Sequence, residues 1–293
     1  MNNLVKNVID QELTSAGINL IWSSNDINVA PGMKTITEVS SSNAPISEAI
    51  INYIFPQVSG EVELVHYTNL TSFDKIIKSE ELRLYSMLKR LGQAEFISFI
   101  NEHNLDGYLQ QKNGKTTYQE MMGDLFYTSF TTKNIKDEDL MWRTFGENHA
   151  GVKIIFKLKV IEKRAELREI FYHSRAQGGR TLIKNIHEKI YSQFSRHFII
   201  RGISRIGAFY LPLGIGLEGE EEVRLLIKSY GTGKAYDLIK NDGSYDYIPL
   251  KIGHRKNEFC DISIVEVQAG SACNKASITN MLNNSTFKGT KVI

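Results

Sequence analysis

Three charged residues alternate late in the chain, in the order Glu220, Glu222 and Arg224. The residues that alternate with them include Val223 and Leu225, so the segment predicts a strand with one charged and one apolar face. Three charges on one face require water, each other or a ligand. Carboxylates held in this way can stabilise a positive charge that develops in a reaction, or take a proton from an attacking group. The alternative is an ordinary glutamate–arginine pair at the solvated edge of a sheet.

Three other short segments carry residues suited to holding a ligand. They are His66-Tyr67-Thr68, Tyr127-Thr128-Ser129-Phe130-Thr131, and Met141-Trp142-Arg143, the last of which comes shortly before His149-Ala150-Gly151-Val152. Aromatic faces hold flat rings, and arginine binds a pyrophosphate through two parallel hydrogen bonds. Arg83, Arg143 and Arg224 are candidates for that second role, and Arg224 could equally orient Glu222 by pairing with it. A histidine that follows a strand is more often packed or capped than functional. The segments therefore indicate a ligand site only when they are taken together.

The periodicity of the chain predicts the elements that position these segments. Strands with few helices between them argue for an α+β fold rather than a doubly wound parallel sheet. Strands are expected at residues 62–66, 82–85, 125–131, 152–158, 167–172, 221–228, 234–240, 245–252 and 261–268. Helices are expected at residues 1–14, from Pro45, after a cap at Thr68 or Asn69, from Asp137, at 181–203 and at 274–283.

The same reading divides the chain into an extension and a body. Residues 1–59 are expected to form an N-terminal helical extension, and residues 60–293 a single α+β domain with a helical insertion at about 88–123. The length of 293 residues is sufficient for one large domain or two small ones.

The four segments, in this order, resemble a family of bacterial proteins formerly described as a domain of unknown function, which looks like a branch of the ADP-ribosyltransferase fold. The resemblance covers roughly residues 60–285 and implies a split, mostly antiparallel β-sheet that binds NAD as the ADP-ribose donor, with no metal. It implies catalytic roles for Glu222, Glu220 and His66. The cofactor-binding residues that it implies are His66, Tyr67, Thr68, Thr128, Ser129, Phe130, Arg143 and Arg224. The Asn-Asp-Pro segment usual in the family is absent, and Met87 to Gly123 stands in its place.

The uneven distribution of charge suggests what the acceptor of such a transferase is. Residues 1–60 carry two lysines against five acidic residues, a net of −3, and residues 153–205 carry thirteen basic against four acidic residues, a net of +9. A basic excess of this size suits a polyanion, either a nucleic acid or a phosphate-bearing cofactor. We expect a nucleic acid acceptor, RNA being favoured, bound through residues 153–205. A solvated helix face is the alternative. The acidic extension is expected to mimic that polyanion or to contact an antitoxin.

Several functions therefore stay open at this point. The first is an NAD-dependent ADP-ribosyltransferase that acts as a toxin or anti-phage effector, similar to the toxin of toxin–antitoxin–chaperone systems. The second is a protein-directed ADP-ribosyltransferase or an NAD glycohydrolase with the same site. The others are a non-catalytic module that senses nucleotides, and a metal-independent ribonuclease that uses His66 with Glu222.

Composition narrows the cellular setting. No window approaches 18 consecutive apolar residues, so no membrane span is expected, and the N-terminal residues do not match a secretory signal. The two cysteines, Cys260 and Cys273, form neither a disulfide framework nor a zinc motif. We expect a cytoplasmic protein with reduced thiols.

Overall fold

The computed structural model describes the whole chain except residues 40–42, 91–93, 173–178, 212–217, 230–233 and 254–256. It has the expected α+β fold, with helices and a mixed, mostly antiparallel sheet. The chain forms two compact units, each assembled from three segments. We call residues 1–56, 87–125 and 170–215 the helical unit, and residues 57–86, 126–169 and 216–293 the sheet unit.

This division differs from the expected extension at 1–59 and single domain at 60–293. Residues 1–56 pack against two later segments of the helical unit, because their apolar faces need partners that lie far along the chain. The predicted insertion at about 88–123 is largely helical and belongs to the same unit.

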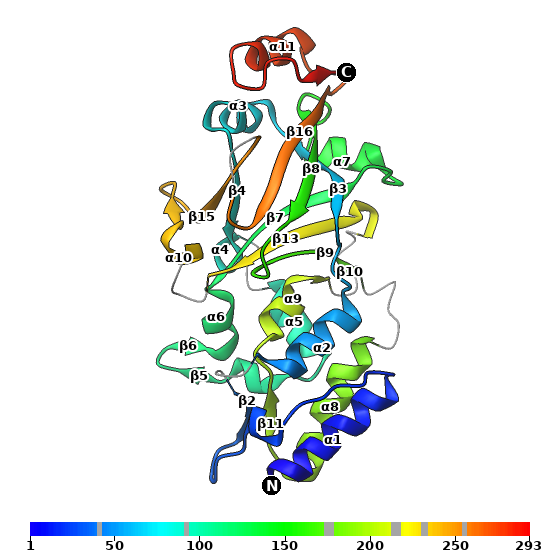
Figure 1. Cartoon of the computed structure of the whole chain (residues 1–293), viewed down its shortest axis with the longest axis vertical. Coiled ribbons are helices and arrows are strands. Elements are labelled where there is room, and N and C mark those ends of the chain that lie inside the picture. Colours follow the sequence, from blue (N-terminus) through cyan, green and yellow to red (C-terminus); the bar gives the residue numbers. More distant parts are fainter. Residues whose placement is uncertain (40–42, 91–93, 173–178, 212–217, 230–233, 254–256) are drawn as a thin grey trace. The chain divides into compact units, whose positions relative to one another are not determined.

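The helical unit contains short strands among its helices. Its elements are α1 (Asn2–Ser15), η1 (Ser24–Asp26), β1 (Ile27–Asn28), β2 (Thr35–Glu38), α2 (Pro45–Ile54), α4 (Met87–Arg90), α5 (Ala94–Glu102), η2 (Asp106–Leu109), β5 (Gln111–Lys112), β6 (Lys115–Thr116), α6 (Thr117–Met122), β10 (Phe171–Tyr172), α8 (Gly179–Phe194), β11 (His197–Ile199), α9 (Ile203–Ala208) and β12 (Tyr210–Leu211). Figure 1 shows α1 beside α8, which it contacts. The predicted helix at 181–203 is too long, because the chain leaves α8 at Phe194 and pairs β11 with β2 in parallel.

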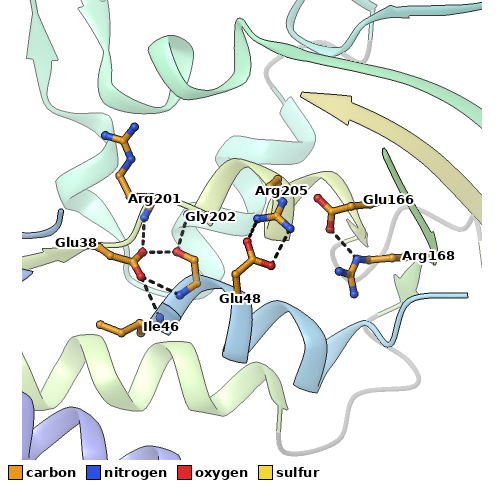
Figure 2. A network of polar contacts seen from close by, with 9 residues as sticks. Glu38, Ile46, Glu48, Glu166, Arg168, Arg201, Gly202 and Arg205 are labelled. Atoms are coloured by element: carbon orange, nitrogen blue, oxygen red, sulfur yellow. Dashed lines mark hydrogen bonds and ion pairs between the residues drawn. The ribbon is translucent and has the colours of Figure 1, made fainter. Parts of the chain in front are cut away.

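A buried carboxylate organises the start of α2 in the helical unit (Figure 2). Glu38 is 2% exposed, and its Oε1 accepts hydrogen bonds from the backbone N–H groups of Ile46 at 3.0 Å and Ser47 at 3.1 Å. Its Oε2 accepts from the Ser47 hydroxyl and, at 3.0 Å, from the backbone N–H of Arg201. Glu38 therefore satisfies N–H groups at the helix terminus that have no partner within the helix.

The sheet unit holds most of the strands. Its elements are β3 (Glu61–Thr68), α3 (Leu70–Ser79), β4 (Glu81–Ser86), β7 (Leu125–Thr132, from its second residue), α7 (Glu138–Thr144), β8 (Val152–Val160), β9 (Ala165–Glu169), η4 (Glu218–Glu220), β13 (Glu222–Lys228), α10 (Lys234–Asp237), β14 (Lys240–Asn241), β15 (Asp246–Lys251), β16 (Cys260–Ala269), α11 (Lys275–Asn283) and β17 (Lys291–Val292). The strand order is β14-β15-β4-β7-β3-β8-β16-β17, and β13 pairs with both β7 and β9.

The sheet branches at β7, which pairs with β4, β3 and β13. The pairing of β7 with β4 covers Tyr127 and Phe126, whereas its pairing with β3 covers Thr132 and Thr131. One face of the sheet is covered by a single apolar core to which β3, β4, β7, β8, β13, β15 and β16 all contribute, together with α3 and α11, which lie next to each other in Figure 1. The residues that alternate with this core include Tyr67 on β3, and Glu222 and Arg224 on β13.

Most predicted strands and caps are confirmed, and two strand predictions are wrong. The predicted strand at 234–240 contains the short helix α10 instead. The predicted strand at 167–172 is divided after Glu169 into β9 and β10, which belong to different units. Across the described residues, no helix combines the length and apolar character that crossing a membrane requires.

Candidate functional site

The segment that contains Glu220 and Glu222 is not a continuous strand. Glu220 ends the short helix η4, and Glu221 has a φ of 43°, which a residue other than glycine seldom adopts. β13 begins only at Glu222. The expectation that Glu220 shares a strand face with Glu222 and Arg224 is therefore wrong for Glu220, because the chain turns between the two glutamates.

The Glu222 carboxylate lies at the start of β13 and is only 7% exposed. Its Oε1 accepts hydrogen bonds from the Ser129 hydroxyl and, at 2.6 Å, from Nε of Arg224. Its Oε2 accepts from Nη2 of Arg224 at 3.0 Å, so the two side chains form a bidentate ion pair. Such a pair fixes the plane of the carboxylate as well as its position. Arg224 therefore orients Glu222, the second of the two roles considered for it.

Thr131 of β7 holds the turn that precedes β13. Its hydroxyl donates to the backbone carbonyl of Glu220 at 2.7 Å, and the Thr132 hydroxyl lies 3.5 Å from the Glu221 carboxylate. Helix α7 contacts the same turn, where a Cβ at Gly219 would lie 3.1 Å from the Leu140 side chain. These contacts fix the turn from two sides and thus determine where β13 begins.

His66 connects to Glu222 through a single residue. Its Nδ1 lies 3.0 Å from the backbone carbonyl oxygen of Ser129, whose hydroxyl bonds Glu222. A carbonyl oxygen only accepts, so Nδ1 carries the proton and Nε2 is the acceptor of the neutral ring. The β3–β7 ladder ends at Val65 and Thr131, and the imidazole of His66 reaches β7 just beyond that end, with its ring 6.1 Å from that of Phe130.

Tyr67 points to the other side of β3 and joins two of the sequence segments. Its ring meets Trp142 edge-on at 5.1 Å, and its hydroxyl donates to Glu138 at 3.2 Å. Lys153 also donates to Glu138, at 2.6 Å. That hydrogen bond is the main cause that lowers the pKa of Glu138, while burial first, and then Glu138, raise the pKa of Tyr67. Tyr67 and Trp142 belong to a small apolar cluster with Val65, Met141 and Ile155.

The remaining site candidates occupy different environments. Thr68 and Thr128 are buried, and Phe130 is part of the main apolar core. Thr68 is the last residue of β3 and lies close to Gly151. A Cβ added at Gly151 would lie 2.4 Å from the Thr68 carbonyl oxygen. Arg143 is 57% exposed on α7 and pairs with Asp139 at 2.8 Å. The structure thus brings His66, Ser129, Glu222 and Arg224 together and places Arg143 on the exposed side of its helix.

A second glutamate–arginine pair lies beside the first and was not predicted from the sequence. Arg168 Nε donates to Glu166 at 2.8 Å, both side chains are buried, and Figure 2 shows the pair. β9 and β13 are antiparallel neighbours in which Arg168 lies directly opposite Arg224. The signal in the sequence is the repeated Glu-x-Arg pattern, at Glu166 and Arg168 and again at Glu222 and Arg224. Facing arginines repel each other, so each requires its own carboxylate.

The basic segment at 153–205 is divided between the two units and is partly neutralised within each. In the sheet unit, Lys153 pairs with Glu138 and Lys157 with Glu61. In the helical unit the acidic extension supplies the partners: Glu12 bonds Lys189, and Glu48 bonds Arg205, as Figure 2 shows for the latter. Charge counted along the sequence therefore overstates the charge available to a partner.

Neither a metal cluster nor a known relative accounts for the site. Within the described ranges of the chain, no three His, Cys, Asp or Glu side chains lie together as a metal site would require. No protein-family model matches this chain, and neither a curated protein nor a solved structure does.

Proposed function

We propose that this protein is an NAD-dependent ADP-ribosyltransferase whose catalytic carboxylate is Glu222. The observation that carries the proposal is the buried, oriented carboxylate at the start of β13, held by Ser129 and Arg224, with His66 bound to the same Ser129. A carboxylate fixed in this way needs no reorganisation when positive charge develops beside it. Four sequence segments that the family resemblance relies on converge in one unit, which supports the proposal further.

In the proposed reaction the bond between the ribose C1′ and the nicotinamide nitrogen breaks. Nicotinamide leaves with the bonding electrons and becomes neutral, and the ribose acquires oxocarbenium character. Glu222 stabilises that charge and accepts a hydrogen bond from a ribose hydroxyl. A nucleophilic oxygen or nitrogen of the acceptor forms the new bond to C1′ and loses its proton to a base, for which Glu220 is the proposed residue. His66 grips the ribose through Nε2.

The acceptor decides which kind of transferase this is. The pairing of several basic residues at 153–205 with acidic neighbours weakens the case for a nucleic acid bound by that segment alone. A protein acceptor, or water in an NAD glycohydrolase, uses the same carboxylate chemistry. The proposal includes the role that the resemblance implies, a toxin or anti-phage effector opposed by an antitoxin.

The test is NAD turnover by the wild type and the Glu222→Gln variant, with labelled NAD and either total RNA or lysate protein. The variant keeps the shape of the side chain and removes its charge, so turnover is expected to fall by on the order of 10²–10³. Expression of the wild type is expected to slow growth, and expression of Glu222→Gln is not. Unchanged turnover in a folded Glu222→Gln protein would contradict the assignment of the site.

A further inference from the structure

Strand β7 contacts the segment that carries Glu222 at three evenly spaced points. The contacts join residues two apart on β7 to residues two apart on the other segment, in opposite directions: Thr131 with Glu220, Ser129 with Glu222, and Tyr127 with Arg224. Residues two apart in a strand share one face, so the three β7 side chains lie together. The first contact holds the turn, the second holds the carboxylate, and the third involves the aromatic ring of Tyr127.

The Tyr127 ring is buried against the guanidinium of Arg224. Tyr127 is 5% exposed and Arg224 is 2% exposed. The preceding residue, Phe126, belongs to the main apolar core, so the Tyr127 side chain points to the other face of the strand. The guanidinium carbon of Arg224 lies 5.4 Å from the centre of the ring. At this separation the negative face of the ring attracts a cation, and the attraction is stronger where water is excluded.

The residue on the other side of Arg224 repels it. β13 pairs with β9 as well as with β7 (Figure 1), and the residue directly opposite Arg224 on β9 is Arg168. Arg168 is buried and bonds Glu166 at 2.8 Å. Like charges that face each other across two strands are unfavourable. The tyrosine ring on β7 is therefore the favourable neighbour for the guanidinium of Arg224.

The ring matters for Glu222 because Arg224 orients that carboxylate through two hydrogen bonds. A long arginine side chain has many rotamers, so it orients a partner only as well as it is itself held. We propose that Tyr127 is a positioning residue of this site, whose ring holds Arg224 and, through it, the carboxylate of Glu222. This inference rests on the proposed transferase function for the reaction that it serves. The alternative is that Tyr127 only packs the sheet.

Steady-state kinetics of the full-length protein with varied NAD separate the two roles. Tyr127→Leu is expected to lower kcat about tenfold with little change in KM, since loss of the contact between a buried cation and an aromatic ring is of that order. Tyr127→Phe keeps the ring face, so its kcat is expected to stay within about twofold of the wild type.

Tyr247→Leu is the matched control for loss of a buried ring beside an arginine. Tyr247 is 6% exposed, and the guanidinium of Arg83 lies 4.4 Å from the centre of its ring. Arg83 pairs with Asp242 at 3.3 Å, so the arrangement is similar but does not include Glu222. Tyr247→Leu is expected to lower the melting temperature about as much as Tyr127→Leu does, and to leave kcat unchanged.

A double-mutant cycle tests the same link without NAD. Tyr127→Leu and Glu222→Gln are made separately and together, and the equilibrium constant for unfolding in denaturant is measured for each. Because both residues contact Arg224, the combined effect is expected to differ from the product of the separate effects by about fivefold or more. The same cycle with Tyr247→Leu in place of Tyr127→Leu is expected to be multiplicative to within about twofold.

The outcomes separate this inference from the proposed function. A wild type that does not turn over NAD would remove the transferase, and the cycle would then decide the inference, which independent effects of Tyr127 and Glu222 would overturn and coupled effects would support. In an active enzyme, an unchanged kcat in Tyr127→Leu would overturn the inference and leave the proposed function intact. An equal fall in kcat for Tyr247→Leu, or for Tyr127→Phe, would also overturn it, because the effect would then not come from the ring beside Arg224.

Discussion

Ser129 bonds Glu222 through its hydroxyl and His66 through its carbonyl, so one residue of β7 connects β13 with β3. β7 is also the strand at which the sheet branches. The two contacts use different parts of the same residue, and a side-chain substitution changes only one of them. Ser129 therefore allows the orientation of Glu222 to be tested without altering the backbone contact of His66.

Ser129→Ala is expected to lower kcat for NAD turnover by about ten- to a hundredfold. A hydrogen bond to a charged group contributes about 1.5–3 kcal/mol, and its loss leaves the carboxylate less well oriented. Steady-state kinetics with varied NAD measures the effect. Ser129→Thr retains a hydroxyl on a residue type that suits a strand, so it is the control and is expected to stay close to wild-type kcat. Equal kcat for the alanine and threonine variants would show that the hydroxyl is not used.

Arg224→Met is expected to destabilise the protein by about 3–5 kcal/mol, because it leaves the buried Glu222 carboxylate without its bidentate partner. The double variant Glu222→Gln with Arg224→Met removes both charges and is expected to regain most of that stability. Denaturant unfolding measures the free energy of each. Lys228→Met, at the other end of β13, is the control, with an expected change within about 0.5 kcal/mol. A double variant as unstable as the single one would mean that Arg224 stabilises the fold by packing.

His66→Ala is expected to raise KM for NAD about tenfold and to change kcat less, since a residue that only grips the ribose contributes equally to ground and transition states. His66→Asn can still donate to the Ser129 carbonyl but lacks Nε2 of the imidazole, so it separates the structural contact from the ribose contact. If KM rises for both variants, Nε2 is the important atom. A KM that stays at the wild-type value in both would leave His66 a purely structural residue.

The buried His187 of the helical unit predicts a loss of stability in mild acid. Burial first, and then the neighbouring His197, lower the pKa of His187 below its usual 6.5, against the opposing effects of a hydrogen bond with the Phe198 backbone and of Asp106 and Glu188. The unfolded chain then takes up a proton near pH 6.5 that the folded chain does not, so stability falls as the pH drops below about 6.5. Uptake of one such proton changes the free energy of unfolding by at most about 1.4 kcal/mol per pH unit. The melting temperature of His187→Gln is expected to vary less between about pH 7.5 and 5 than that of the wild type, and an identical slope would disprove this assignment.

Sequence reasoning succeeded where the signal is local. Pro45 at the start of α2, Asn69 as the N-cap of α3 and Asp137 as the N-cap of α7 are all where the sequence predicts them. In each case the residue acts on backbone groups within one helical turn, so no distant partner is needed to recognise it. The alternation of Glu222 and Arg224 with apolar residues likewise needs only the strand itself.

Sequence reasoning failed where contacts with residues far along the chain determine the local structure. Helix α8 ends at Phe194 because residues 197–199 form a strand with Thr35 to Thr37, which no pattern near residue 197 reveals. Glu220 leaves the strand because Glu221 adopts a positive φ, stabilised by contacts with Thr131 and Thr132 from β7. The excess charge of residues 153–205 was overestimated for the same reason, since Glu12 and Glu48, which lie far earlier in the chain, neutralise part of it.

The bond between Ser129 and Glu222 spans 93 residues of chain, and this separation has a consequence for biosynthesis. A ribosome adds about 5–20 residues per second, so Glu222 is made roughly 5–20 s after Ser129. Throughout that interval β7 lacks the neighbour that bears the carboxylate, and the nascent polypeptide carries no assembled site. A cell that makes this protein therefore has a period of seconds in which the early segments have been made and the carboxylate on which the proposed function depends has not.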